Sequence, residues 1–293
     1  MSDTAARTMW ERFEPVHDLV YFAPEVRRAA DDLGLRGYWM GYFALRAAPL
    51  GPAPASVVTS SFYVFHPHRV ARALPDAWSH ADPADVLAAR ARAMDAAMTG
   101  LYGPDVVASA EIAEAADLAW EAARAADTGG RVLAAANQAL ARPAQPHVRL
   151  WQALTTLREH RGDGHVAVLV SRGVGPVAAM ALKCAAGESD PEFQRTTRKW
   201  DEEQWRAAQA ELGTRGWLDE DGLLTKEGAA AHEEIEADTD AAATLPWTAL
   251  GPAATARLAH LLEPLARTVL DSGIIPPANP VGLTGATWPS ATG

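Results

Sequence analysis

The densest group of residues able to do chemistry is a short polar run, His160-Arg-Gly-Asp-Gly-His165. Two imidazoles with a carboxylate between them can bind a metal or pass a proton, and glycine allows a ligand to approach the backbone closely. A spacing of five does not place both histidines on one helical face, so a shared site depends on a bend at the glycines. One hypothesis makes His160, Asp163 and His165 catalytic, with Arg161 binding the ligand. The alternative is a structural corner, in which Asp163 caps the next helix and both histidines bond backbone carbonyls.

A third histidine, His17, lies in an apolar and aromatic stretch between residues 13 and 22, next to Asp18 and close to Glu14. Such a histidine is more often a core residue whose hydrogen bonds are satisfied internally. If it joined the 160–165 run, it would supply a third nitrogen to a divalent metal or a haem iron. The sequence leaves both interpretations open and identifies no cofactor.

Residues 37–47 are almost wholly apolar and lack a polar stripe, which predicts a central helix enclosed on most sides. Tyr38, Tyr42 and Arg46 are spaced by four and therefore share a face. With Trp39 beside them, they are suited to line a pocket that offers hydroxyls and one guanidinium to an anionic or aromatic ligand. The alternative is a core helix whose Arg46 pairs with an acid at the rim.

Composition excludes several classes of protein. The 293 residues carry 26 Lys and Arg against 37 Asp and Glu, a formal charge of -11, which argues against a non-specific nucleic-acid binder. A single cysteine, Cys184, excludes an intrachain disulfide framework and suits a reducing compartment. No apolar run reaches the roughly 18 residues of a membrane span, so we expect a cytoplasmic protein with no membrane partner.

The motifs of several enzyme classes are also absent. The chain has no Gly-x-Ser-x-Gly elbow, no phosphate-binding loop ending in Gly-Lys-Ser/Thr, no His-Glu-x-x-His and no cysteine pair. These absences disfavour hydrolases, nucleoside triphosphatases and zinc fingers. The chain also contains ten tryptophans, and most of them are expected in the core or at interfaces.

The periodicity predicts a mostly α fold with three parts. Residues 1–145 form a helical ligand-binding domain, residues 146–245 a winged-helix-like domain, and residues 246–293 a helix followed by an irregular tail. In the middle part we expect one helix to end near residue 159, at the two glycines, and a second to span residues 201–212. A tight turn at residues 219–222, between two short apolar segments, predicts one short β-hairpin ahead of a long polar helix.

The stretch from Trp217 to Gly228, WLDEDGLLTKEG, resembles the wing and following helix of MarR-type regulators. With WERFEPVHD, which begins at Trp10, and REHRGDGH, which begins at Arg158, it is similar to an actinobacterial helix-turn-helix family. The resemblance implies an architecture and no particular activity. The chain departs from MarR proteins where DNA would lie, because the recognition helix begins Asp-Glu-Glu and the wing tip is Asp-Glu-Asp. Such acids repel phosphates, and Arg195, Arg198 and Lys199 would compensate only in part.

Two functions follow as hypotheses. The first is a binding protein for a small hydrophobic or aromatic molecule, acting as a regulator or by sequestration, with DNA binding disfavoured. The second is an enzyme that uses the 160–165 run for acid-base, metal or haem chemistry on a small aromatic substrate. Both require the early aromatic helix and the later histidines to meet around one hollow. The oligomeric state stays open, a homodimer included.

Overall fold

The computed structural model describes residues 4–276 and residue 279, and in that part of the chain the only β-structure is a single bridge. The described residues form sixteen α-helices and two short 3-10 helices, which confirms the predicted mostly α class. In chain order the α-helices are α1 (Ala5–Phe22), α2 (Pro24–Asp32), α3 (Gly37–Ala47), α4 (Ala55–Ser61), α5 (Pro67–Ala71), α6 (Pro83–Tyr102), α7 (Pro104–Val107), α8 (Ala110–Ala125), α9 (Val132–Gln138), α10 (Pro146–Ser171), α11 (Pro176–Ala185), α12 (Pro191–Arg198), α13 (Glu202–Thr214), α14 (Lys226–Ala242), α15 (Leu245–Leu250) and α16 (Pro252–Asp271).

Proline and capping residues set where many of these helices begin. Pro24, Pro83 and Pro146 stand in the first turns of α2, α6 and α10, where a missing N–H would have had no helical partner. Asp201 caps α13 and forms a reciprocal capping box with Gln204. These local signals lie in the sequence, and the predicted starts of α2 and α13 are confirmed.

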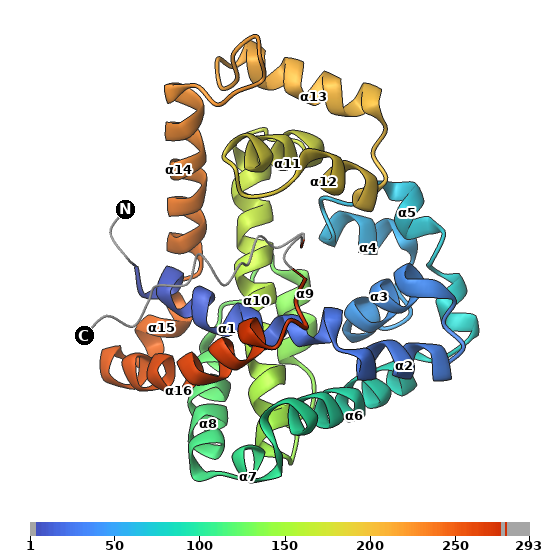
Figure 1. The fold of residues 1–293 in the computed structure, drawn as a ribbon, viewed down its shortest axis with the longest axis vertical. Helices are drawn as coiled ribbons and strands as arrows, with labels where there is room; N and C mark the ends of the chain where they lie inside the picture. Colours follow the sequence, from blue (N-terminus) through green and yellow to red (C-terminus); the bar gives the residue numbers. More distant parts are fainter. Residues whose placement is uncertain (1–3, 277–278, 280–293) are drawn as a thin grey trace.

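The described chain has two hydrophobic cores, and α10 contributes side chains to both as it runs from one to the other (Figure 1). The larger core gathers side chains from α1 to α10 and from α15 and α16, so both ends of the described chain contribute to it. We call this part the large lobe. The smaller core lies among the end of α10, α11, α13 and the middle of the polar helix α14, and we call this part, with α12, the small lobe. The irregular tail expected after α16 falls mostly outside the described residues.

The α10 helix corrects one prediction, because it runs without a break from Pro146 to Ser171 and includes Gly162 and Gly164. Glycine in a helix interior costs about 1 kcal/mol relative to alanine, which packing can offset. At Gly164 the reason is visible, since a Cβ there would lie 2.5 Å from Arg131 Nη1 and 3.3 Å from the Ala242 Cβ. The glycine therefore permits close packing of neighbouring segments and does not bend the helix.

The expected two-stranded wing is reduced to a single antiparallel bridge between Leu218 and Leu224. Two backbone hydrogen bonds close the turn, from Asp219 N to Leu223 O at 2.9 Å and from Thr225 N to Trp217 O at 3.0 Å. Thr225 then caps α14 by accepting from Gly228 N. A hairpin of two true strands is thus not formed here, although the turn and the long polar helix lie where the sequence placed them.

Among the described residues, no single helix has the length and apolar character of a membrane span. The criteria are met only by α10 and α11 taken together, across a bend of 102°.

Candidate functional site

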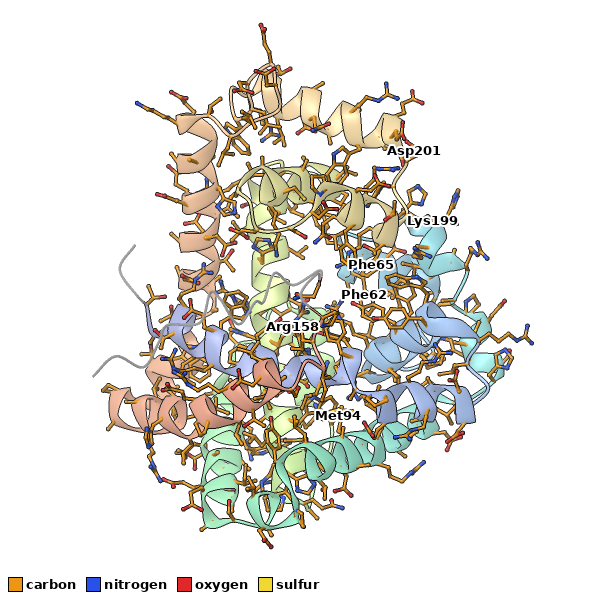
Figure 2. The ribbon with its side chains drawn as sticks, in the orientation of Figure 1. Phe62, Phe65, Met94, Arg158, Lys199 and Asp201 are labelled. Atoms are coloured by element: carbon orange, nitrogen blue, oxygen red, sulfur yellow. The ribbon has the colours of Figure 1, made fainter. Side chains whose placement is uncertain are left out.

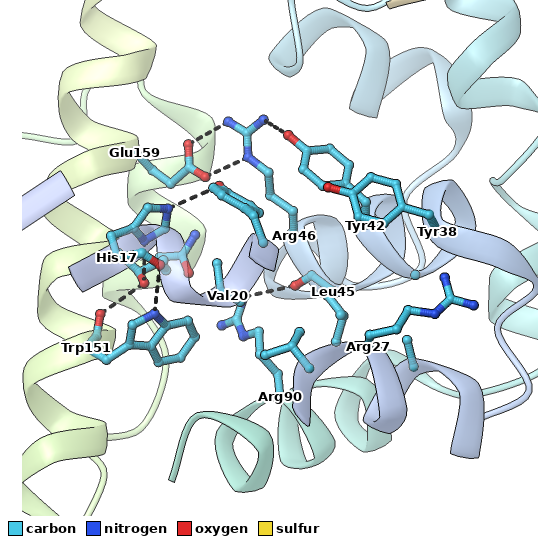
Figure 3. Close-up of a pocket in the computed structure, with 16 residues that line it drawn as sticks. His17, Val20, Arg27, Tyr38, Tyr42, Leu45, Arg46, Arg90, Trp151 and Glu159 are labelled. Carbon is cyan, nitrogen blue, oxygen red and sulfur yellow. Dashed lines mark hydrogen bonds and ion pairs between the residues drawn. The ribbon is translucent and has the colours of Figure 1, made fainter. Parts of the chain in front are cut away.

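The best-formed pocket of the described chain lies inside the large lobe, where α1, α2, α3, α6, α9 and α10 meet (Figure 3). Its interior offers about 50 Å³ to solvent-sized molecules. This space accommodates roughly three to five waters. The apolar part of the wall comes from Val20, Val26, Ala30, Leu45 and Trp151. A hollow with this lining favours an apolar ligand or ligand group.

The polar wall is an ion-pair cluster centred on Glu159 of α10. Arg46 donates two hydrogen bonds to the Glu159 carboxylate, at 2.8 and 2.9 Å, and Arg158 donates one at 3.0 Å. Burial alone would raise the pKa of Glu159, but Arg46 and Arg158 outweigh it and hold that pKa well below its usual range. Glu159 therefore stays ionised and fixes both guanidiniums.

Hydrogen bonds determine the proton positions of His17. The Thr155 hydroxyl donates its only proton to Trp151 O at 2.9 Å. It must therefore accept a hydrogen bond from His17 Nδ1, which lies 3.1 Å away. Burial, with help from Arg158, lowers the pKa of His17 well below 6.5, so the ring is neutral and Nδ1 carries its one proton. His17 Nε2 then accepts from the Tyr21 hydroxyl at 3.1 Å. The Tyr21 hydroxyl oxygen can therefore still accept a hydrogen bond from a donor on a ligand.

Four of the six ligand-binding residues expected from the sequence line this pocket, namely His17, Tyr38, Tyr42 and Arg46. The shared helical face of Tyr38, Tyr42 and Arg46 points into it, and Arg46 also forms the pair with an acid that the alternative interpretation required. Trp39 does not line it. Its ring packs against Phe65, and the Arg69 guanidinium lies over the Trp39 ring, 4.3 Å from the ring centroid.

Arg161 also lies elsewhere, in a buried network that ties α10 to α14 and α1. It donates to Asp240 at 2.6 Å, and both its guanidinium and that of Arg7 lie over the Trp10 ring. Arg7 pairs with Asp240 and Glu236 as well. The network holds helices together and does not face the pocket.

The three residues proposed as catalytic are not part of the pocket and do not converge. Asp163 accepts from the Leu133 and Ala134 amides at 2.9 and 3.0 Å, so it caps α9, which comes earlier in the chain than α10. Burial raises the pKa of Asp163 to about 6, although these amides oppose the shift. His165 Nδ1 bonds Thr239 of α14 at 2.9 Å, and His160 Nε2 is buried with no hydrogen-bond partner.

The expectation that His160 and His165 share a hollow with the early aromatic helix is therefore wrong. In an unbroken α10 the two histidines project from different faces, because the predicted bend does not occur. Within residues 4–276 and 279, no group of three or more histidine, cysteine, aspartate or glutamate side chains is placed to hold a metal ion.

Sequence reasoning missed Tyr21, Trp151, Thr155 and Glu159, all of which line the pocket. The signal was present, since the last three recur at a spacing of four along α10, as on one face of a helix. The helix was expected to span residues 147 to about 159, and these residues were not considered as one of its faces.

Comparison with known proteins places the whole described fold in one family. Residues 6–276 match the model of a helix-turn-helix family. The chain belongs to this helix-turn-helix family. No curated protein and no solved structure matches it.

The recognition helix expected at residues 201–212 corresponds to α13, and a turn at residues 199–201 joins it to α12; we refer to these two helices and the turn as the helix-turn-helix segment. Lys199 ends α12 in the left-handed conformation, with φ 68°, and is the only non-glycine residue with positive φ in the described chain. Trp200, next in the turn, donates to Val64 O of the large lobe at 2.8 Å. The turn therefore rests on the large lobe, while α13 faces outward at the top of the molecule (Figure 1).

The outward face of α13 is acidic. Glu202, Glu203 and Glu211 are exposed there with one arginine, Arg206, and the nearby turn exposes its own acids at residues 219–221. The compensation expected from upstream basic residues is weak. Arg195 pairs with Glu192, and Arg198 is half-buried with its guanidinium over the Phe65 ring, 4.4 Å from the centroid.

Proposed function

We propose that this helix-turn-helix protein binds a small, single-ring aromatic or hydrophobic molecule in the pocket of the large lobe. The observation that carries the proposal is the pairing of an apolar hollow with a fixed polar wall, His17–Tyr21 on one side and Arg46–Glu159 on the other. Such preformed sites, apolar with a few oriented polar groups, are typical of small-molecule binding. The protein is expected to act in the cytoplasm.

In this proposal the pocket sequesters the ligand. The helix-turn-helix then serves as scaffold or contacts another protein, and DNA binding is disfavoured. Because acids surround α13, the electrostatic contribution that supplies most baseline DNA affinity is missing. The likeness to MarR-type regulators is confined to the turn and the Leu-Thr-x-x-Gly step at residues 224–228, and it supports a shared local architecture.

Isothermal titration calorimetry with benzoate and with its neutral isostere benzamide tests ligand binding. At least one of the two should bind the wild-type protein. Val26→Phe should abolish that binding, because Val26 lines the hollow and a phenyl ring would fill it. Val106→Phe is the matched control, since Val106 is exposed on α7 and the same change there should leave binding intact. Failure of both compounds to bind, or equal binding by Val26→Phe, would overturn the proposal.

A further inference from the structure

One guanidinium of the small lobe lies next to the aromatic residues at the polar end of the pocket. Arg198, the last residue of α12, does not itself line the pocket, but it lies over the Phe65 ring, whose centroid is 5.6 Å from that of Tyr42, a lining residue. Its Nε is buried and has no hydrogen-bond partner. Its guanidinium makes no ion pair with any residue of the described chain.

Positive charge exceeds negative charge around this point. Arg46 and Arg158 share the single ionised carboxylate of Glu159, and Arg198 adds a third guanidinium with no counterpart. Asp18 does not supply one, because burial and the neighbouring Glu14 raise its pKa well above the usual range and both of its oxygens lack partners. In Figure 2, Arg158 of α10 and Phe62 and Phe65 mark this region.

Glu14 is directed at Arg158 and not at Arg198. Burial raises its pKa, its contact with Arg158 is long, at 3.5 Å, and its second oxygen has no partner. A buried cation without a counter-charge is costly, so the cluster is suited to receive an anion.

Hydrogen-bond donors are also in surplus at this end. The Tyr42 hydroxyl accepts from Arg46 at 3.3 Å, which leaves its own proton free to donate. The Tyr38 hydroxyl, stacked on Tyr42 and partly exposed at the pocket mouth, bonds no residue within 4–276 or 279. Together with Arg198 Nε, these groups present three donors and no matching acceptor.

We propose that the ligand is an organic monoanion, whose carboxylate is bound by Arg198 with Tyr38 and Tyr42 while its apolar ring occupies the hollow. The inference rests on the proposed function and adds the chemical class of ligand and a binding residue from the helix-turn-helix. Guanidinium and carboxylate form strong charge-assisted hydrogen bonds, and the surplus charge explains why an anion would be preferred over a neutral molecule of the same shape. Because Arg198 ends α12, the bound carboxylate would join the two lobes.

The test compares benzoate with benzamide on wild-type protein and on Arg198→Gln. Benzoate should bind wild-type protein at least about tenfold more tightly than benzamide. Arg198→Gln should remove this preference by weakening benzoate alone. Arg195→Gln, which removes the same charge from α12 at a residue paired with Glu192, is the matched control and should keep the preference. Arg198→Lys retains the charge and should retain most of the preference, which separates loss of charge from damage to the fold.

Each outcome has a distinct meaning. Equal binding of benzoate and benzamide, or an unchanged preference in Arg198→Gln, overturns the anion inference and leaves the proposed pocket standing. Binding of neither compound overturns both.

Discussion

At the scale of single residues, the polar wall depends on Glu159, one buried carboxylate that neutralises Arg46 and Arg158. Removing its charge would leave Arg46 with no ion pair and Arg158 with only its 3.5 Å contact to Glu14. Arg46 would keep only its bond to Tyr42 and its contact with the Phe62 ring, whose centroid lies 4.2 Å away. The pocket geometry and the stability of the large lobe are therefore coupled at this residue.

Glu159→Gln should lower the free energy of unfolding by about 3 to 5 kcal/mol, the usual effect of breaking a buried ion pair on one side. Urea unfolding followed by circular dichroism measures the change. Glu114→Gln is the control, because its pair with Arg257 lies on the surface and its loss should be barely detectable. A Glu159→Gln protein as stable as the control would show that the pair adds no stability.

His165 makes stability depend on pH. Burial lowers its pKa to about 4 from an ordinary 6.5, so between these values the unfolded chain binds a proton that the folded chain excludes. Stability due to this group is thus present above pH 6.5 and lost as the pH falls toward 4. His160, with a pKa lowered to about 4 by burial and Arg131, acts in the same direction.

His165→Asn should flatten the decline in stability below pH 6.5, because the asparagine amide can keep the donor toward Thr239 and does not titrate. Thermal unfolding midpoints measured across this pH range give the slope. His260→Asn, an exposed substitution of the same kind, should keep the wild-type slope. An identical slope in His165→Asn would mean that His165 contributes nothing to the acid sensitivity.

At the scale of elements, the small lobe shows why its Leu-Thr-x-x-Gly step ends in glycine. A Cβ on Gly228 would overlap the Trp217 carbonyl oxygen and lie 3.0 Å from Leu224 Cδ1. The obstructing atoms include backbone, which cannot rotate away as a flexible side chain can. The first turn of α14 is therefore held against the turn at residues 217–225 only if residue 228 has no side chain.

Gly228→Ala should destabilise the protein by about 1 to 3 kcal/mol or more, the range for overpacking at a rigid site. Gly100→Ala is the matched control, because a Cβ there meets nothing within 4 Å and alanine favours the helix. Chemical denaturation of both proteins checks the contrast. If Gly228→Ala were no less stable than Gly100→Ala, the close approach described here would be incorrect.

Local signals predicted individual helices well, and tertiary packing accounts for the errors. Tyr38, Tyr42 and Arg46 were grouped correctly because their spacing is a property of one helix. The break expected at Gly162 and Gly164 failed because Asp163 caps α9 from within α10 and Gly164 accommodates Arg131. Such long-range contacts leave no periodic trace in the sequence, so the continuity of α10 beyond Glu159 could not be inferred, although the spacing of its pocket face was visible.

At the scale of the whole molecule, the distribution of charge determines which partners the helix-turn-helix can bind. Acids cover the outward face of α13, while Arg198 turns inward to Phe65. The arginine expected to support DNA binding from outside thus lies beside the pocket. This arrangement turns the Arg198 side chain toward the large lobe and leaves α13 poorly suited to phosphate.

We expect no binding of a mixed-sequence DNA duplex at physiological salt. The double variant Glu202→Lys with Glu203→Lys should gain affinity that falls steeply as salt increases, because each added lysine can neutralise a phosphate. Fluorescence anisotropy of labelled duplex at several salt concentrations measures both proteins. Tight, sequence-selective binding by the wild-type protein would contradict the acidic-face argument.

The most direct test of a ligand site in the large lobe that Arg198 of the small lobe completes is a crystal soaked with 4-bromobenzoate, because bromine is located by its anomalous scattering. We predict one bromine peak in the hollow between Val26 and Trp151, with carboxylate density at Arg198, Tyr38 and Tyr42. An empty hollow at saturating ligand, or bromine bound only elsewhere on the molecule, would contradict it.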